Sequence, residues 1–557
     1  MSKRSARSSK AVDQLLPKWT ERVSSDGSGR DPLGLSRVSF IIADYLLFGI
    51  ASTTDRARYF SFFCWALWHV GREQAPERFG DLRRHLRRRE AVLALATLAN
   101  DPKSSPVGVT AAKIEWKKGL QEKRFNTDFR VLPSNSMGAY GQYYAGSLGN
   151  LGLIEHSEDG LDRASSRPAT TLATAFQAAV AKTPYIRKRL FASEWISLED
   201  LRATAKYLTI DALGEGFAEE ERKGLTEVFF ALSGRFSTDR HLLRRCTLLH
   251  LLHVIQEYEQ HGTEIPLGDL DWYVGYPVYY YDLLWLTEAR AVRYVVPAPL
   301  RTCHTLWRQF FAHQFLAHSL ETVLWAMLEV LGQDQSGRLV AELVKILLSP
   351  DVFRRIGEIT GQRCKTPADL LRAAEVAVDS MAQDARKAVK HSMSELSLVG
   401  ERSDVAVEIA RALVMLAVLW ARWRKGDDAM RTVAVNAPHE LWLGTILPLV
   451  ESWSDAEIGW HRALEELISA CILDQHDRIM YQKGRLDSSW LHRSDGRVFK
   501  DQDYEPSERT SRHGSAVSIL ADLGLVQISG RKCRGLTSAG RRLLQRLLKE
   551  ADDARSN

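Results

Sequence analysis

Two groups of residues have the types and the spacing that metal-dependent chemistry needs. Cys246, His250, His253 and Glu257 recur at i, i+4, i+7 and i+11, so a helix would present all of them on one side. Such a row could hold a transition metal. Leucines and a valine are interleaved with these positions, however, and the helix is apolar on nearly every face. We therefore predict core histidines, and a chain that holds no metal and no other cofactor.

The second group is Asp101 followed by Glu115 and Lys117, the spacing of the acid and Glu-x-Lys ligands in many magnesium-dependent nucleases. That chemistry needs the Glu-x-Lys pair on a buried strand, whereas segment 111–119 is no better as a strand than as a helix. The sequence also lacks a GxxxxGK[ST] phosphate loop, a GxSxG elbow and an HExxH pair. We favour a protein without catalytic residues, and keep the nuclease as an alternative.

Composition places the chain among soluble globular proteins. It has 557 residues, 45% hydrophobic and 26% charged, with a net charge of +6 that permits an anionic partner without demanding one. The six cysteines form no CxxC pair, which suits a reducing cytosol. No apolar run reaches the ~20 residues that span a bilayer. We expect a cytoplasmic protein with no membrane segment.

The elements that would position any site are mostly helices. Apolar residues recur at three and four through most of the chain, and no clean repeat of a solenoid unit is present. We predict a mainly α, multi-domain fold with two small winged-helix-like α/β elements. The expected spans are a disordered basic arm (1–30), an N-terminal helical domain with a winged-helix-like element (31–185), a central helical domain (186–465), a C-terminal winged-helix domain (466–550) and a tail (551–557).

One phrase occurs twice. The stretches "SLGNLGLIEHSEDGLDR" (147–163) and "ILADLGLVQISGRKCRG" (519–535) each read as a helix end, "LGL", a short strand and a polar turn before another helix. The second copy resembles the latter half of a bacterial winged helix-turn-helix domain. The resemblance implies that the helix before "LGL" enters a DNA major groove and that the turn, or wing, lies on the backbone.

The two copies differ in charge. Residues 527–549 hold seven lysines and arginines and no acid, whereas residues 147–163 hold four acids against one arginine. Phosphate contacts need cations, because counterion release supplies most non-specific affinity. We therefore predict that the first copy is structural or binds protein, and that the C-terminal copy binds DNA. The predicted DNA-binding residues are Arg509, Arg512, Arg531, Lys532, Arg534, Arg541 and Arg542.

The segment 31–68 resembles the opening of a group of bacterial proteins with an "lG...i...ad.LfpGit..t.RARYf.f..W" signature. The matching positions are Gly34, Asp44, Leu47, Gly49, Thr54, Arg56, Ala57, Arg58, Tyr59 and Trp65. Phe48 stands where the group often has proline. The resemblance implies a gene close to restriction and phage-defence genes, and it brings no catalytic residues with it.

The arginines of this signature lie between two very apolar helices. Arg56 or Arg58 paired with Asp44 would clamp these helices together, or the arginines would bind a partner. These observations together predict a non-enzymatic, DNA-binding accessory subunit of a multi-protein anti-phage defence system, with a partner ATPase, helicase or nuclease. The alternative is a kleisin-like structural subunit of a chromosome-loading-type ATPase complex.

Overall fold

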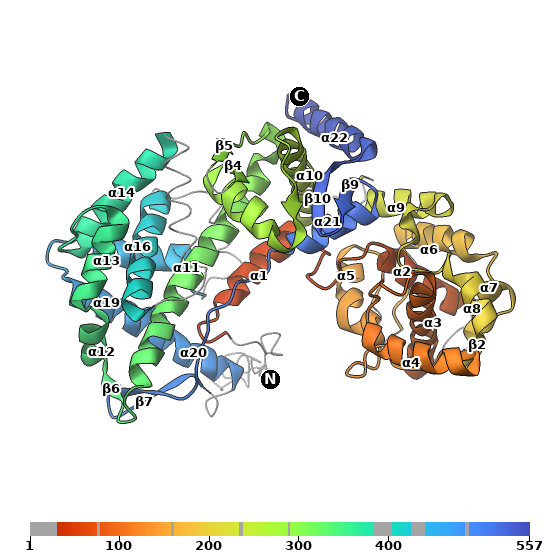
Figure 1. The fold of residues 1–557 in the computed structure, drawn as a ribbon, viewed down its shortest axis with the longest axis horizontal. Helices are drawn as coiled ribbons and strands as arrows, with labels where there is room; N and C mark the ends of the chain where they lie inside the picture. The colour runs from red at the N-terminus through yellow and green to blue at the C-terminus, as the bar shows by residue number, and fades with distance from the viewer. Residues whose placement is uncertain are drawn as a thin grey trace, which may run out of the picture.

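A computed structural model describes residues 31–74, 78–156, 161–232, 238–287, 290–383, 404–424, 440–484 and 489–556. The arm predicted for residues 1–30 lies outside these ranges. The mainly α prediction is confirmed, because helices dominate the described residues and the few sheets are small and antiparallel. The described chain forms two lobes joined near its middle (Figure 1).

The first lobe is built around two helix pairs. In it α2 (Arg58–Glu73) packs on α6 (Arg167–Val180), and α3 (Phe79–Asn100) packs on α8 (Leu198–Ala205). Its two strands, β1 (Arg124–Asn126) and β2 (Trp195–Ser197), pair antiparallel. The other elements are α4 (Val109–Glu122), η1 (Tyr140–Tyr144), α5 (Ala145–Asn150), α7 (Pro184–Arg187), η2 (Leu190–Ala192), η3 (Ala212–Gly214), η4 (Gly216–Ala218) and α9 (Glu219–Phe229). The predicted boundary at residue 185 therefore falls inside this lobe.

The second lobe is organised by α11 (Arg301–Leu331), whose residues are buried along almost its entire length. It packs on α16 (Val405–Trp423) and on α1 (Leu35–Leu46), which joins this lobe although it precedes the first in sequence. Because apolar residues cover nearly every face of α11, the helix is stable only when it is surrounded on all sides. None of the described helices is apolar over a length that would cross a membrane.

The remaining elements of the second lobe surround this centre. The elements up to residue 347 are α10 (Asp239–Gln260), β3 (Ile265–Pro266), η5 (Leu267–Asp269), η6 (Asp271–Tyr280), β4 (Leu283–Thr287), β5 (Arg290–Arg293), η7 (Ala298–Leu300), β6 (Arg338–Leu339) and α12 (Val340–Leu347). Those that follow are α13 (Pro350–Thr360), α14 (Pro367–Gln383), α18 (Leu443–Ser452), α19 (Trp460–Leu467), η8 (Ile468–Leu473), α20 (Asp474–Lys483), β7 (Leu491–Ser494), β8 (Arg497–Lys500), α21 (His513–Asp522), β9 (Val526–Ser529), β10 (Lys532–Leu536) and α22 (Ser538–Ser556). Because α22 continues to residue 556, most of the predicted tail is helical.

A buried carboxyl group positions the helix that leads into the first copy of the phrase. Glu90 on α3 is 2% exposed, and its Oε1 accepts a hydrogen bond from the backbone N–H of Ala139 at 2.7 Å, just before η1. Gly138 has a φ of +64°, and a Cβ there would lie 2.0 Å from Glu90 Oε2. Burial raises the pKa of Glu90 to about 8, although the Ala139 hydrogen bond acts in the opposite direction.

The raised pKa of Glu90 predicts a pH-dependent stability. The folded-state pKa of about 8 lies above the ordinary value of 4.5, so the stabilisation is complete below pH 4.5 and disappears as pH rises through 8. Glu90→Gln, which keeps an acceptor for Ala139, should flatten this dependence. The free energy of unfolding, measured with urea at pH 5, 6, 7 and 8, should fall with rising pH in the wild type relative to the variant. The total change over this range should be at most about 5 kcal/mol. Parallel curves for the two proteins would contradict an ionisable, buried Glu90.

Candidate nucleic-acid interface

The C-terminal winged element is assembled from two distant parts of the chain. Strand β10 pairs antiparallel with β9, its neighbour in sequence, and with β3, which comes from the middle of the chain. Helix α10, which directly precedes β3, packs on β10, α21 and α22. The strand order β3-β10-β9 and the wing between β9 and β10 are those of a winged helix whose first helix and first strand precede a long insertion.

The two copies of the phrase end their first helix in the same way. Gly152 and Gly524 both adopt a left-handed conformation, with φ of +65° and +71°. In each copy the second leucine of "LGL" donates its N–H to a carbonyl five residues earlier, at 2.9 Å in the first copy and 3.0 Å in the second. This is the Schellman helix ending, which glycine favours. The repeated sequence therefore encodes a repeated local structure.

The copies differ after this ending. The second copy continues into a hairpin, whereas the described residues of the first contain only a bridge between Glu155 and Arg163. Asp162 beside this bridge accepts hydrogen bonds from Tyr140 Oη at 2.5 Å and His156 Nδ1 at 2.9 Å. Glu158 and Asp159, which contribute to the acidic charge of this turn in the sequence, lie outside the described residues.

Helix α21, which the winged-helix resemblance would place in a DNA groove, lies against the segment between α1 and α2. Ser515 Oγ donates to the backbone oxygen of Ser52 at 3.0 Å, and Ala516, Val517, Ile519 and Leu520 are buried. These residues form the inner face of the helix, whereas on the opposite face Gly514 is exposed and Ser518 and Ala521 are half-buried. The expected groove-binding role of α21 stays a prediction.

Two of the predicted DNA-binding arginines are buried in the protein. Arg509 forms an ion pair with Glu321, whose side chain is fully buried. Arg512 donates from Nη1 to Asp44 Oδ1 at 3.2 Å and to the backbone oxygen of Ile50 at 3.0 Å. Their side chains are only 7% and 6% exposed, so neither can reach a phosphate. The prediction was wrong for these two residues, because their charges serve internal carboxylates.

The five other predicted cations lie at the surface of the winged element. Lys532 and Arg534 are 57% and 56% exposed, and both contact Glu264, at 3.3 and 3.2 Å. Arg541 pairs with Glu259, which also accepts from the backbone of β10. The remaining two, Arg531 on the wing and Arg542 on α22, are not buried and form no ion pair with the described residues. The surface of this element keeps an excess of cations over acids.

The predicted pairing of Asp44 with Arg56 or Arg58 is wrong, because Asp44 binds Arg512 instead. Arg58 and Glu221 form a fully buried ion pair at 3.1 Å within the first lobe. Arg58 also donates to the backbone oxygen of Tyr207 at 2.9 Å. A buried guanidinium needs such partners to satisfy its donors. The expected structural role of this arginine therefore fits its contacts, although the partner differs.

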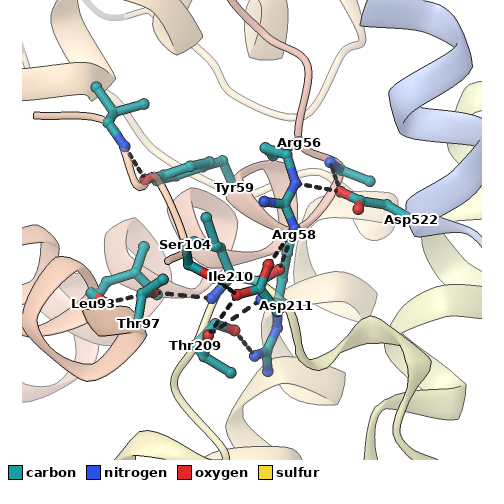
Figure 2. A network of polar contacts seen from close by, with 12 residues as sticks. Arg56, Arg58, Tyr59, Leu93, Thr97, Ser104, Thr209, Ile210, Asp211 and Asp522 are labelled. Carbon is teal, nitrogen blue, oxygen red and sulfur yellow. Dashed lines mark hydrogen bonds and ion pairs between the residues drawn. The ribbon is translucent and has the colours of Figure 1, made fainter. Parts of the chain in front are cut away.

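Arg56 joins the two lobes. Its Nη2 donates to Asp211 in the first lobe at 2.8 Å, and its Nε donates to Asp522 at the end of α21 at 3.1 Å (Figure 2). The backbone N–H of Ala57 donates to the same Asp522 oxygen at 2.9 Å. Burial opposes the charge of Arg56, but the two carboxylates outweigh it and raise its pKa. Burial also raises the pKa of Asp522, and Arg56 only partly offsets that effect.

The lobe contacts are reciprocal between the two copies. Asp522 and Asn150 occupy the same position, directly before "LGL". Asp522 binds Arg56 beside the first residue of α2, and the backbone oxygen of Asn150 accepts from His241 near the start of α10, at 3.2 Å. Each phrase thus contacts a residue at or just before the start of a helix in the other lobe, α2 or α10. This equivalent position is the sequence signal that could have identified Asp522 in advance.

The candidate catalytic groups do not assemble into a reactive centre. His250 is buried, and its Nε2 lies 3.0 Å from His304 Nδ1, whose other ring nitrogen is 2.8 Å from Asp282. Burial lowers the pKa of His250 well below its usual value, so its ring is neutral. The expected core role of this histidine is confirmed. Among the described residues, no group of three or more His, Cys, Asp or Glu side chains is arranged to hold a metal ion.

The nuclease alternative needs a strand where the structure has a helix. Glu115 and Lys117 both lie on α4, and residues two apart on a helix point about 200° away from each other. Glu115 contacts Lys118 at 3.0 Å. Asp101 follows the end of α3 and is exposed. The geometry that this chemistry requires is therefore not formed by these three residues.

Comparison with known proteins adds no assignment. No family model matches this sequence, and no curated protein or solved structure is similar to it.

The acids that bind the surface cations, Glu259 and Glu264, were missed in the sequence because they lie in and after α10, far along the chain from the cations they contact.

The lobe contact predicts different effects for the two carboxylates that bind Arg56. Asp522→Ala should speed hydrogen exchange of the Ala57 amide and of residues 513–522, and should lower the free energy of unfolding by about 1.5–3 kcal/mol for each charged hydrogen bond that it removes. Asp211→Ala removes a partner of the same arginine inside the first lobe, so the Ala57 amide should stay protected. Equal exchange of that amide in both variants would contradict the assigned contact.

Proposed function

We propose that this chain is a non-enzymatic, DNA-binding accessory subunit of a multi-protein bacterial defence system. The observation that carries the proposal is the cationic surface of the C-terminal winged element. Residues 527–549 contain seven cations and no acid, and Arg531 and Arg542 lie at the surface without an ion pair in the described part of the chain. Surface cations on a wing and on the following helix suit the phosphate backbone of a duplex.

The unpaired cations of the C-terminal element lie on the wing and on α22, and they determine the mode of binding that we propose. In that mode the contacts are to phosphates rather than to base edges. Phosphate contacts position a protein on DNA but carry no sequence information. Binding should therefore be independent of sequence and strongly dependent on salt.

The assignment to a defence system rests on the resemblance of segment 31–68. In that setting the helical part of the second lobe would dock a partner ATPase, helicase or nuclease. The nature of the partner separates this proposal from a kleisin-like role, because a kleisin-like subunit would co-purify with a coiled-coil ATPase. Expression together with the neighbouring genes, followed by purification of the complex, distinguishes the two.

The wing cations predict a measurable salt dependence. Replacing Arg531 and Arg542 with alanine should leave the fold intact, because neither side chain is buried or paired within the described chain. The affinity for a DNA duplex, measured by fluorescence anisotropy over a series of salt concentrations, should fall. The slope of log affinity against log salt should decrease by about 0.9 for each phosphate that the variant no longer neutralises. Glu264→Gln should act in the opposite direction, because it releases Lys532 and Arg534.

Arg363→Ala with Lys365→Ala is a matched control. Both residues are exposed and lie in the sequence between α13 and α14. These two helices are on the side of the second lobe away from α22 (Figure 1). This variant carries the same charge change and should bind DNA as the wild type does. If the wing variant and the control variant bind equally well, the C-terminal surface is not the DNA site.

A further inference from the structure

The first lobe carries a second cationic surface, on α4 and β1. Between residues 113 and 130, all six lysines and arginines are exposed, and three acids lie among them. The cations are Lys113, Lys117, Lys118, Lys123, Arg124 and Arg130. We call this group, together with Trp195, the α4–β1 surface.

The three acids of this stretch are already engaged. Glu115 contacts Lys118 at 3.0 Å, and Glu122 contacts Arg124 at 3.4 Å. Asp128 points to the neighbouring helix α3, where it binds Arg87 at 2.5 Å. The other four cations of the surface form no ion pair with any described residue. They are Lys113, Lys117, Lys123 and Arg130.

Packing forces these cations outward. Phe125 on β1 is buried and stacks on Trp116 of α4, with ring centroids 5.1 Å apart. The helix approaches so closely that a Cβ on Gly119 would lie 2.1 Å from the Phe125 ring. Lys113 and Lys117, four residues apart, share the flank of α4 that is turned away from this contact. Lys123, with φ of +55°, connects α4 directly to β1.

An exposed aromatic ring lies at one end of the outer face of the two-stranded sheet. Trp195 on β2 pairs with Asn126 on β1, and the strands alternate so that Phe125 and Ile196 face inward. Trp195 is 41% exposed. The guanidinium of Arg124 lies 4.6 Å from its ring centroid. An exposed ring beside a planar cation on a two-stranded sheet is a stacking platform for an unpaired base.

We propose that the α4–β1 surface binds single-stranded nucleic acid. A base stacks on Trp195 and Arg124, and a neighbouring phosphate contacts Lys123, which directly precedes Arg124. The ligand is a single strand because a duplex buries the base faces that the tryptophan would contact. This proposal rests on the proposed nucleic-acid function for its class of ligand, but it uses residues of the other lobe only.

The test compares the affinities of the full chain for an oligothymidine single strand and for a duplex. Trp195→Ala should weaken single-strand binding by about fivefold to a hundredfold, the usual effect of removing one stacked base, and should leave duplex binding unchanged. Trp195→Phe should restore most of the affinity. Lys123→Gln, which removes an exposed charge next to Arg124, should weaken oligothymidine binding and reduce its salt dependence.

The Arg531→Ala, Arg542→Ala variant separates the two proposals. Loss of duplex binding in that variant with oligothymidine binding retained supports both surfaces. Unchanged oligothymidine binding in the Trp195 and lysine variants overturns the α4–β1 surface, whatever the wing variant does. If the wing variant binds duplex normally while Trp195→Ala fails to bind oligothymidine, the α4–β1 surface stands and the C-terminal site falls. Binding to anionic vesicles but not to oligothymidine would also overturn the single-strand proposal.

Discussion

The structure depends on a partly buried loop that lies between the two lobes. Residues 47–57 connect α1 to α2; Ser52, Thr53 and Asp55 are exposed, and Ile50 and Thr54 donate to carbonyls within the loop, but other backbone groups of the loop are turned to the second lobe. Buried carbonyl and N–H groups must still be paired. Side chains from the second lobe pair them: Arg244 binds the carbonyl of Phe48, and Asp522 binds the N–H of Ala57. The arginines around this loop therefore hold the lobes together.

This constraint explains why charge in the sequence is a poor guide to charge at the surface. The carboxylate partner of Arg509 is 188 residues away, and that of Arg512 is 468 residues away. Arg244 uses no carboxylate, because its donors reach three backbone oxygens, two of them at the end of α9. Burial lowers the pKa of this arginine to about 9, and it stays charged at neutral pH. No local pattern distinguishes such residues from exposed cations.

Predictions from the sequence succeed where the physics is local. The helix ending at "LGL" depends on a glycine and on backbone bonds five residues apart, so it was predictable from the repeated phrase. The mainly α character follows equally from apolar periodicity. The completion of the C-terminal sheet by β3 was not predictable, because a two-residue strand has no periodicity. Nor was the partner of Arg58, since Glu221 comes from a helix expected in another domain.

The two copies of the phrase make the same kind of contact between the lobes through different atoms, a side-chain carboxylate in Asp522 and a backbone oxygen in Asn150. In both copies the residue before "LGL" holds the lobes together, and this role requires α5 and α21 to stay packed at the junction. Any ligand of the winged elements must therefore bind the assembled molecule at surfaces away from the junction. The wing meets that condition, and Glu264 offsets part of its charge, because it contacts both Lys532 and Arg534. The proposed nucleic-acid binding is compatible with lobe docking, since the two would use different residues of the same module.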